Sequence, residues 1–79
     1  MTNHDRLRRV FVESLALSPD FDADTIRLYE TPGWDSMGHM TLVVAIEDEF
    51  DVELDPDQII EMDSFEVAVR TLRELGVST

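Results

Sequence analysis

The sequence contains no cysteine, so neither a disulfide nor a thiolate-bound metal ion can brace the fold. It also contains no lysine, and six arginines stand against 18 aspartates and glutamates. The resulting formal net charge of −12 disfavours nucleic acids and anionic membrane surfaces as partners, and it favours basic protein surfaces. No apolar run is long enough to cross a bilayer, and Glu13 interrupts the N-terminal apolar segment that a secretory signal needs. We therefore expect a cytoplasmic protein.

The chain has 79 residues, which allows one domain, residues 1–79, and no second core. The hydrophobic fraction of 43% is ordinary for a folded protein, so disorder is not expected. A small domain without disulfides depends on well-patterned helix packing. Because the acidic side chains repel one another, added salt or divalent cations should stabilise the fold.

The first stretch with helical periodicity covers Asn3–Leu17. Thr2 and Asp5 have the spacing of a capping box at its start, and Ser18-Pro19-Asp20 ends it. The connection over residues 18–34 has no sustained period, and a loop this long is usually functional or pinned by its own apolar residues. The expected pinning residues are Phe21, Ile26, Leu28 and Tyr29.

The second predicted helix covers Ser36–Phe50 and has two apolar arcs. The core arc contains Leu42, Val43, Ile46 and Phe50, with His39 one turn earlier. The other arc contains Met37, Met40, Thr41, Val44, Glu47 and Asp48. A mixture of methionine and carboxylates predicts that this second arc is an exposed contact surface.

Two further helices are indicated by their start signals. Asp55 is suited to the N-cap of a short third helix, with Pro56 at its first position and Gln58 at its third. Its expected apolar side is Ile59, Ile60 and Met62. The fourth helix begins at Asp63 or Ser64 and stops at Gly76; its stripe is Phe65, Ala68, Val69 and Leu72. The sequence thus predicts an all-α fold, a small four-helix bundle with three longer helices and one short third helix.

Ser36 is the candidate functional residue, because it follows a Pro-Gly turn and stands at the start of the second predicted helix. The unpaired N–H groups of a helix start favour a phosphate ester nearby. Taken alone, a serine at this position is more often an N-cap. Asp35 adds a favourable negative charge at the same helix start.

The run Asp35-Ser36-Met37-Gly38-His39-Met40, continued by Leu42 to Ile46 and by the acidic segment to Leu54, resembles acyl and peptidyl carrier proteins. Their phosphopantetheine attachment motif is Asp-Ser-Leu, and Met37 replaces its leucine here. The resemblance implies a bundle of the acyl-carrier type in which a phosphopantetheinyl transferase moves 4'-phosphopantetheine from coenzyme A onto Ser36. The thiol of this arm would hold an acyl, aminoacyl or polyketide group as a thioester, and the protein itself would catalyse nothing.

The same resemblance makes the second arc a docking surface for acyl-loading, condensing or transferring enzymes with basic patches. Met37, Met40 and Val44 would supply apolar contact, and Glu47 and Asp48 would pair with basic residues. Asp35 would orient the encounter with the transferase, and the protein would be a monomer.

Partner choice cannot be copied from fatty-acid carriers, because Gly38, Thr41 and Ile60 depart from their common pattern. The cargo therefore remains open between polyketide, fatty-acid and other specialised pathways and a peptidyl or aminoacyl carrier. Six apolar residues line a cargo cavity or, as is more common, form ordinary core: Leu42, Ile46, Leu54, Ile59, Met62 and Ala68.

Three other functions fit parts of the sequence. Ser36-Met37-Gly38 imitates half of an esterase nucleophile elbow, with His39 or His4 as base, but Trp34 stands where the elbow needs glycine. An acidic helical adaptor without any attached group shares every feature except modification of the serine.

The third is a calcium site. Asp20, Asp22 and Asp24 occupy the first three ligand positions of an EF-hand loop. Thr25 and Thr31 replace its glycine and its bidentate glutamate, so no metal site is predicted.

Overall fold

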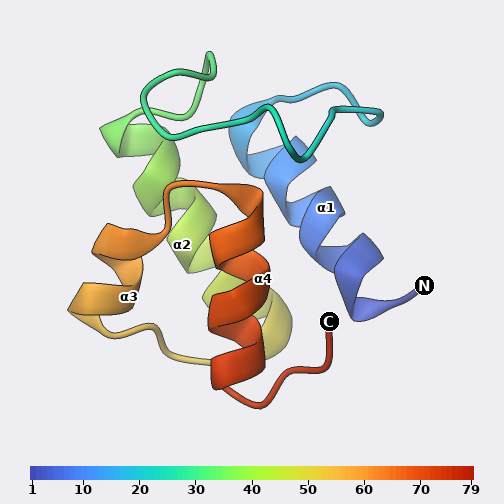
Figure 1. Cartoon of the computed structure of the whole chain (residues 1–79), viewed down its shortest axis with the longest axis vertical. Helices are drawn as coiled ribbons and strands as arrows, with labels where there is room; N and C mark the ends of the chain where they lie inside the picture. The colour runs from blue at the N-terminus through green and yellow to red at the C-terminus, as the bar shows by residue number, and fades with distance from the viewer.

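A computed structural model describes residues 1–79 and contains four helices. They are α1 (Asn3–Leu15), α2 (Ser36–Phe50), α3 (Pro56–Glu61) and α4 (Phe65–Glu74). Figure 1 shows the short α3 at one side of the bundle and the long α1–α2 loop crossing one end of it. The predicted all-α bundle with a short third helix is confirmed. None of the four helices combines the length and the apolar character needed to cross a membrane.

The capping box at the start of α1 is present as predicted. The Asp5 N–H donates to Thr2 Oγ1 across 3.1 Å, and the Thr2 N–H donates back to Asp5 Oδ2 across 3.3 Å. The bond from the Thr2 backbone N–H, followed by a contribution from the Thr2 side chain, lowers the pKa of the Asp5 carboxyl. The helix ends at Leu15, two residues earlier than predicted, because Ala16 adopts a left-handed conformation with φ +56° and its N–H donates to Val12 O.

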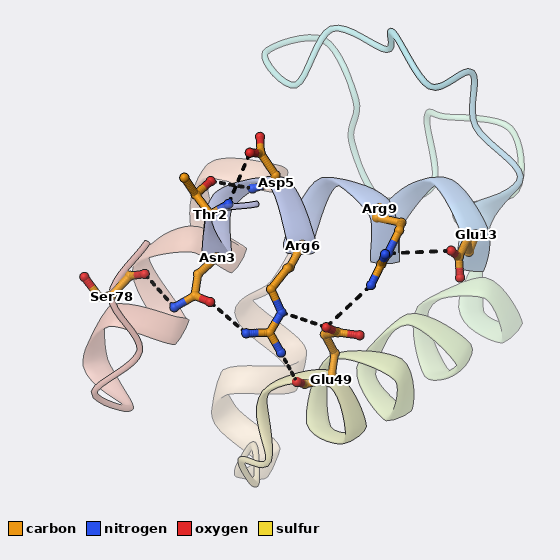
Figure 2. Close-up of polar contacts among 8 residues, drawn as sticks. All are labelled: Thr2, Asn3, Asp5, Arg6, Arg9, Glu13, Glu49 and Ser78. Atoms are coloured by element: carbon orange, nitrogen blue, oxygen red, sulfur yellow. Dashed lines mark hydrogen bonds and ion pairs between the residues drawn. The ribbon is translucent and has the colours of Figure 1, made fainter.

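One pair of contacts joins α1 to the end of α2 (Figure 2). Arg6 Nε lies 2.8 Å from Glu49 Oε2, and a second Arg6 nitrogen donates to the Glu49 carbonyl across 2.7 Å. Arg9 approaches the same carboxylate at 3.8 Å. A half-buried arginine that donates to both the carboxylate and the backbone carbonyl of one residue is better fixed than an exposed ion pair. Glu49 therefore holds two helices together.

The long loop over residues 18–34 is pinned from two directions. Its backbone pairs with the α3–α4 connection, where the Leu28 N–H donates to Asp63 O across 3.0 Å. Ile26 is buried, and Phe21 and Leu28 pack partly against the core, as predicted. The prediction for Tyr29 was wrong, because its side chain is 70% exposed.

Trp34, which the sequence pattern did not place in the core, is fully buried and anchors the loop in place of the exposed Tyr29. Its ring meets Phe11 edge-on with the centroids 5.3 Å apart. Large aromatic side chains bury about 150–250 Å² each. Trp34 thus fixes the end of the loop immediately before α2.

Both helix starts on the C-terminal side follow the sequence signals, and only the expected burial of Ile60 is wrong. Asp55 and Gln58 form the predicted capping box of α3. Ile60 is 74% exposed, because Ile59 and Met62 share the inward face of this short helix and Ile60 is turned about 100° from its neighbour. Ser64, one of the two predicted caps, is the N-cap of α4 and accepts the Val67 N–H across 3.2 Å.

Candidate functional site

The turn that leads into α2 can be formed only with glycine at residue 33. Gly33 has φ +88°, and a Cβ built on it would lie 2.6 Å from the Leu15 carbonyl oxygen. The Trp34 N–H closes the turn by donating to Thr31 O across 3.0 Å. The end of α1 therefore lies directly against the start of α2.

Gly38 allows the same close approach from the helix side. A Cβ built there would lie 2.0 Å from the Gly33 carbonyl oxygen and 3.3 Å from a methyl carbon of Leu15. Glycine within a helix costs about 1 kcal/mol relative to alanine, but here alanine would not fit against the loop backbone. Because residues 33 and 38 both lack a side chain, the loop before α2 can pack directly against the first turn of the helix.

Asp35, rather than Ser36, is the N-cap of α2. Its Oδ1 accepts the Gly38 N–H across 2.9 Å, and its carbonyl accepts the His39 N–H across 2.7 Å. Ser36 is the first residue of the helix and is exposed, so its hydroxyl is not used for capping. No hydrogen bond within the chain uses the backbone N–H of Ser36 or of Met37. An exposed hydroxyl thus lies beside two free donors at a helix N-terminus.

The Ser36 hydroxyl has one side-chain partner, which the sequence did not indicate. Tyr29 Oη lies 3.0 Å from Ser36 Oγ, and either hydroxyl can donate. The Tyr29 backbone is left-handed with φ +69°, and its N–H donates to Trp34 O across 2.7 Å. This contact depends on the path of the loop, and the path of an irregular loop cannot be predicted from the periodicity of the sequence.

His39 is held between the loop and α3. The Trp34 indole N–H donates to His39 Nδ1 across 3.0 Å, so Nδ1 is the acceptor nitrogen of the ring. The proton then lies on Nε2, which donates to the Ile59 carbonyl across 2.8 Å. Both ring nitrogens are occupied, and neither faces Ser36 as a free base.

His4 offers no base either. Its ring packs edge-on against Phe65 at 5.3 Å, and the start of α1 lies at the end of the bundle opposite to the start of α2 (Figure 1). Neither histidine is therefore placed to activate Ser36 as the nucleophile of an esterase.

The second arc of α2 forms a surface next to Ser36. Met37 is 82% exposed, and Met40, Val44 and Asp48 are exposed as expected. Glu47 is only half-exposed, and its Oε2 accepts the Leu54 N–H across 2.9 Å, which ties down the loop after α2. We call the exposed set Met37, Met40, Val44 and Asp48 the α2 surface; its use in docking stays a prediction.

The residues weighed for a cargo cavity form closed core. Leu42, Ile46, Met62 and Ala68 are fully buried, Leu54 is buried, and Ile59 is half-buried. The hollows of the molecule lie elsewhere, one against α1 near Pro19 and one lined by His4 and Phe65. This structure therefore has no open cargo space among these six side chains.

The acidic loop residues serve local turns. The Ser18 hydroxyl hydrogen-bonds to Asp20 and lowers the pKa of that carboxyl, and Asp22 Oδ1 accepts the Asp24 N–H across 3.0 Å. Within residues 1–79 no three histidine, aspartate or glutamate side chains converge as ligands for a metal ion.

Comparison with known proteins gives a consistent result. The model of the family described as "Phosphopantetheine attachment site" matches residues 5–76. A protein named acyl carrier protein from Sulfurovum sp. is 38% identical over 58 residues, which cover 73% of this chain and 77% of that one. Another of that name from Zymomonas mobilis is 30% identical over 70 residues, or 89% and 90% of the two chains. A third, from Phenylobacterium zucineum, is 29% identical over 89% of each chain. No solved structure gives a significant match.

Proposed function

The chain belongs to the acyl carrier protein family that bears a phosphopantetheine attachment site, and from that membership we propose that Ser36 carries the prosthetic group. The family implies a covalently attached 4'-phosphopantetheine. The thiol of this group supplies the chemistry of the family, because it holds cargo as a thioester. The residues of the chain hold the group at one place and present it.

The observation that carries the assignment to Ser36 is its position as the first residue of α2. The N-cap role is filled by Asp35, so the Ser36 hydroxyl is exposed and available for an ester bond. The free N–H groups of Ser36 and Met37 favour the negative charge of a phosphodiester at this place. These residues therefore fit the group that the family implies.

The function proposed for the protein is to carry acyl or related intermediates between the enzymes of a polyketide, fatty-acid or specialised-metabolite pathway. The name shared by the relatives supports acyl cargo over aminoacyl cargo. The α2 surface lies next to the serine and combines apolar side chains with a carboxylate, which suits partner enzymes with basic patches. Tethering raises the effective concentration of cargo at each docked enzyme.

The remaining parts of the proposal concern the partners, the domain organisation and the absence of catalysis. A phosphopantetheinyl transferase is the first partner, and nucleic acids and anionic membranes are not partners of a chain with a net charge of −12. The family match over residues 5–76 supports a single carrier domain over residues 1–79. That this domain acts as a monomer in the cytoplasm is part of the proposal. The protein is a substrate of enzymes rather than an enzyme, which the occupied ring nitrogens of His39 support.

Intact mass spectrometry tests the attachment. The purified protein is incubated with coenzyme A, magnesium and a transferase of broad specificity. The wild type should gain the mass of one phosphopantetheine, and the Ser36→Ala variant should gain none. Ser18→Ala, which removes another exposed serine hydroxyl, is the matched control and should be modified like the wild type. No mass gain in the wild type, or a gain in Ser36→Ala, contradicts the proposal and leaves the acidic adaptor as the alternative.

A further inference from the structure

Tyr29 is the only tyrosine of the chain, and its placement is unusual in two respects. Its side chain is 70% exposed, so burial of the ring does not explain where it lies. Its hydroxyl nevertheless lies 3.0 Å from Ser36 Oγ, although surrounding water could satisfy it equally well.

The backbone of Tyr29 is strained in this position. A φ of +69° lies in the left-handed region, which a residue with an aromatic side chain rarely adopts. Two hydrogen bonds hold it there: Tyr29 N–H to Trp34 O at 2.7 Å, and Arg27 N–H to Thr31 Oγ1 at 2.8 Å across the same turn. Trp34 is fully buried, so the acceptor of the first bond is anchored in the core. Backbone strain that is held so firmly tends to occur at functional sites.

The chemistry of the two hydroxyl groups changes when Ser36 is esterified. A free serine hydroxyl can both donate and accept, so it can pair with Tyr29 Oη in either direction. An ester oxygen has no proton and can only accept, whereas the phenol keeps its proton. A phenolic O–H beside an anionic phosphate oxygen forms a charge-assisted hydrogen bond, which is stronger than a bond between two neutral groups.

We propose that Tyr29 is a positioning residue for Ser36, orienting Oγ before modification and donating a hydrogen bond to the phosphodiester afterwards. This rests on the proposed attachment at Ser36. In that transfer Oγ forms a bond to the pantetheine-bearing phosphorus of coenzyme A. The bond from this phosphorus to the adenosine bisphosphate fragment breaks, and a base of the transferase takes the serine proton. Tyr29 gives and takes no proton in this step.

Tyr29→Phe removes only the hydroxyl and keeps the ring. Because the chain has a single tyrosine, labelling with tyrosine enriched in ¹³C at Cζ gives one resonance that reports hydrogen bonding of the phenol. We expect this resonance to move when the wild type is modified, and to stay in place when Ser36→Ala is treated identically. The ³¹P resonance of the attached group should differ between modified wild type and modified Tyr29→Phe.

The rate of modification gives a second readout. Loss of one neutral hydrogen bond predicts a decrease of about 2- to 10-fold in kcat for Tyr29→Phe with KM for coenzyme A unchanged. Unchanged helical circular dichroism would show that the variant folds. Mass spectrometry could show attachment at Ser36 while the Cζ resonance does not move on modification and the ³¹P resonance is the same in modified wild type and modified Tyr29→Phe. In that case the role of Tyr29 is refuted and the attachment stands. If the wild type gains no mass, both proposals are wrong.

Discussion

The indole N–H of Trp34 donates to Nδ1 of His39 across 3.0 Å, and both side chains are buried. Through Nε2 the same ring reaches the Ile59 carbonyl of α3 at 2.8 Å. The loop before Ser36, the first turn of α2 and the short α3 are thus joined by one continuous set of hydrogen bonds. A protonated imidazole has no acceptor nitrogen, so this arrangement requires neutral His39.

We expect nitrogen NMR at neutral pH to find the Nε2–H tautomer for His39. The chain has two histidines, and His39→Gln assigns the signals. In Trp34→Phe, His39 Nδ1 should lose its donor and remain buried, which should lower the free energy of unfolding by about 1–3 kcal/mol. Urea unfolding followed by circular dichroism measures this, and Met37→Ala, at an 82% exposed position, should change stability by less than about 0.5 kcal/mol. An Nδ1–H tautomer would contradict the geometry.

Gly38→Ala should destabilise the protein, although alanine is the better helix former. The added methyl group would meet the Gly33 carbonyl at 2.0 Å, and overpacking of this kind costs about 1–3 kcal/mol. The control is Thr41→Ala, an exposed position in the same helix, where propensity alone should leave stability equal or slightly higher. Chemical unfolding of the two variants side by side tests the argument. A Gly38→Ala protein as stable as the wild type would show that the turn is not pressed against the helix.

Charge reversal should separate docking from stability on α2. Asp48 is exposed and makes no ion pair within the chain, so Asp48→Lys should slow modification and cargo transfer several-fold at low salt without changing stability. Glu47→Lys should slow them too, but it also removes the acceptor of the Leu54 N–H and should cost about 1 kcal/mol of stability. Glu74→Lys on α4 changes the net charge equally and serves as the control. Equal rates for Asp48→Lys and Glu74→Lys would refute docking through this surface.

The capping box of α1 predicts a specific dependence on pH. The pKa of Asp5 is lowered below 3.8 by its bonds to Thr2, so the ionised carboxylate is favoured in the folded state. The stability that this carboxylate contributes is therefore fully present above about pH 3.8, the pKa of the unfolded chain. It is lost as the pH falls through the lower pKa of the folded state. Titration of the Asp5 side-chain carbon by NMR should give this lowered pKa. Thr2→Ala should return it only part of the way toward 3.8, because alanine keeps the backbone N–H and removes only the side-chain contribution. An identical titration in the two proteins would contradict this.

The helix boundaries that local chemistry determines were predictable from the sequence. α2 begins and ends where predicted, because a capping aspartate precedes it and Asp51 adopts a left-handed conformation after it. The capping boxes at Thr2 and Asp55 were likewise confirmed. Asp35 and Ser36 are both good caps, and only the backbone conformation shows that Asp35 takes this role.

Loop residues were less predictable, because their burial depends on tertiary packing rather than on periodicity. Tyr29 was expected inside and lies outside, while Trp34 lies inside with its N–H satisfied by a histidine five residues later. Ile60 was misplaced because a six-residue helix offers too little repetition to define a face. The need for glycine at residue 38 also could not be predicted, because the carbonyl that excludes a methyl group there belongs to Gly33 in the preceding loop.

The two chain ends meet, with Asn3 Nδ2 donating to the Ser78 carbonyl across 2.9 Å, and Figure 1 places both ends away from the start of α2. An affinity tag, fluorophore or fused domain added at either terminus would leave from the pole of the molecule that is distant from Ser36. The protein can therefore be immobilised or labelled through either end while the serine side stays open to approaching enzymes.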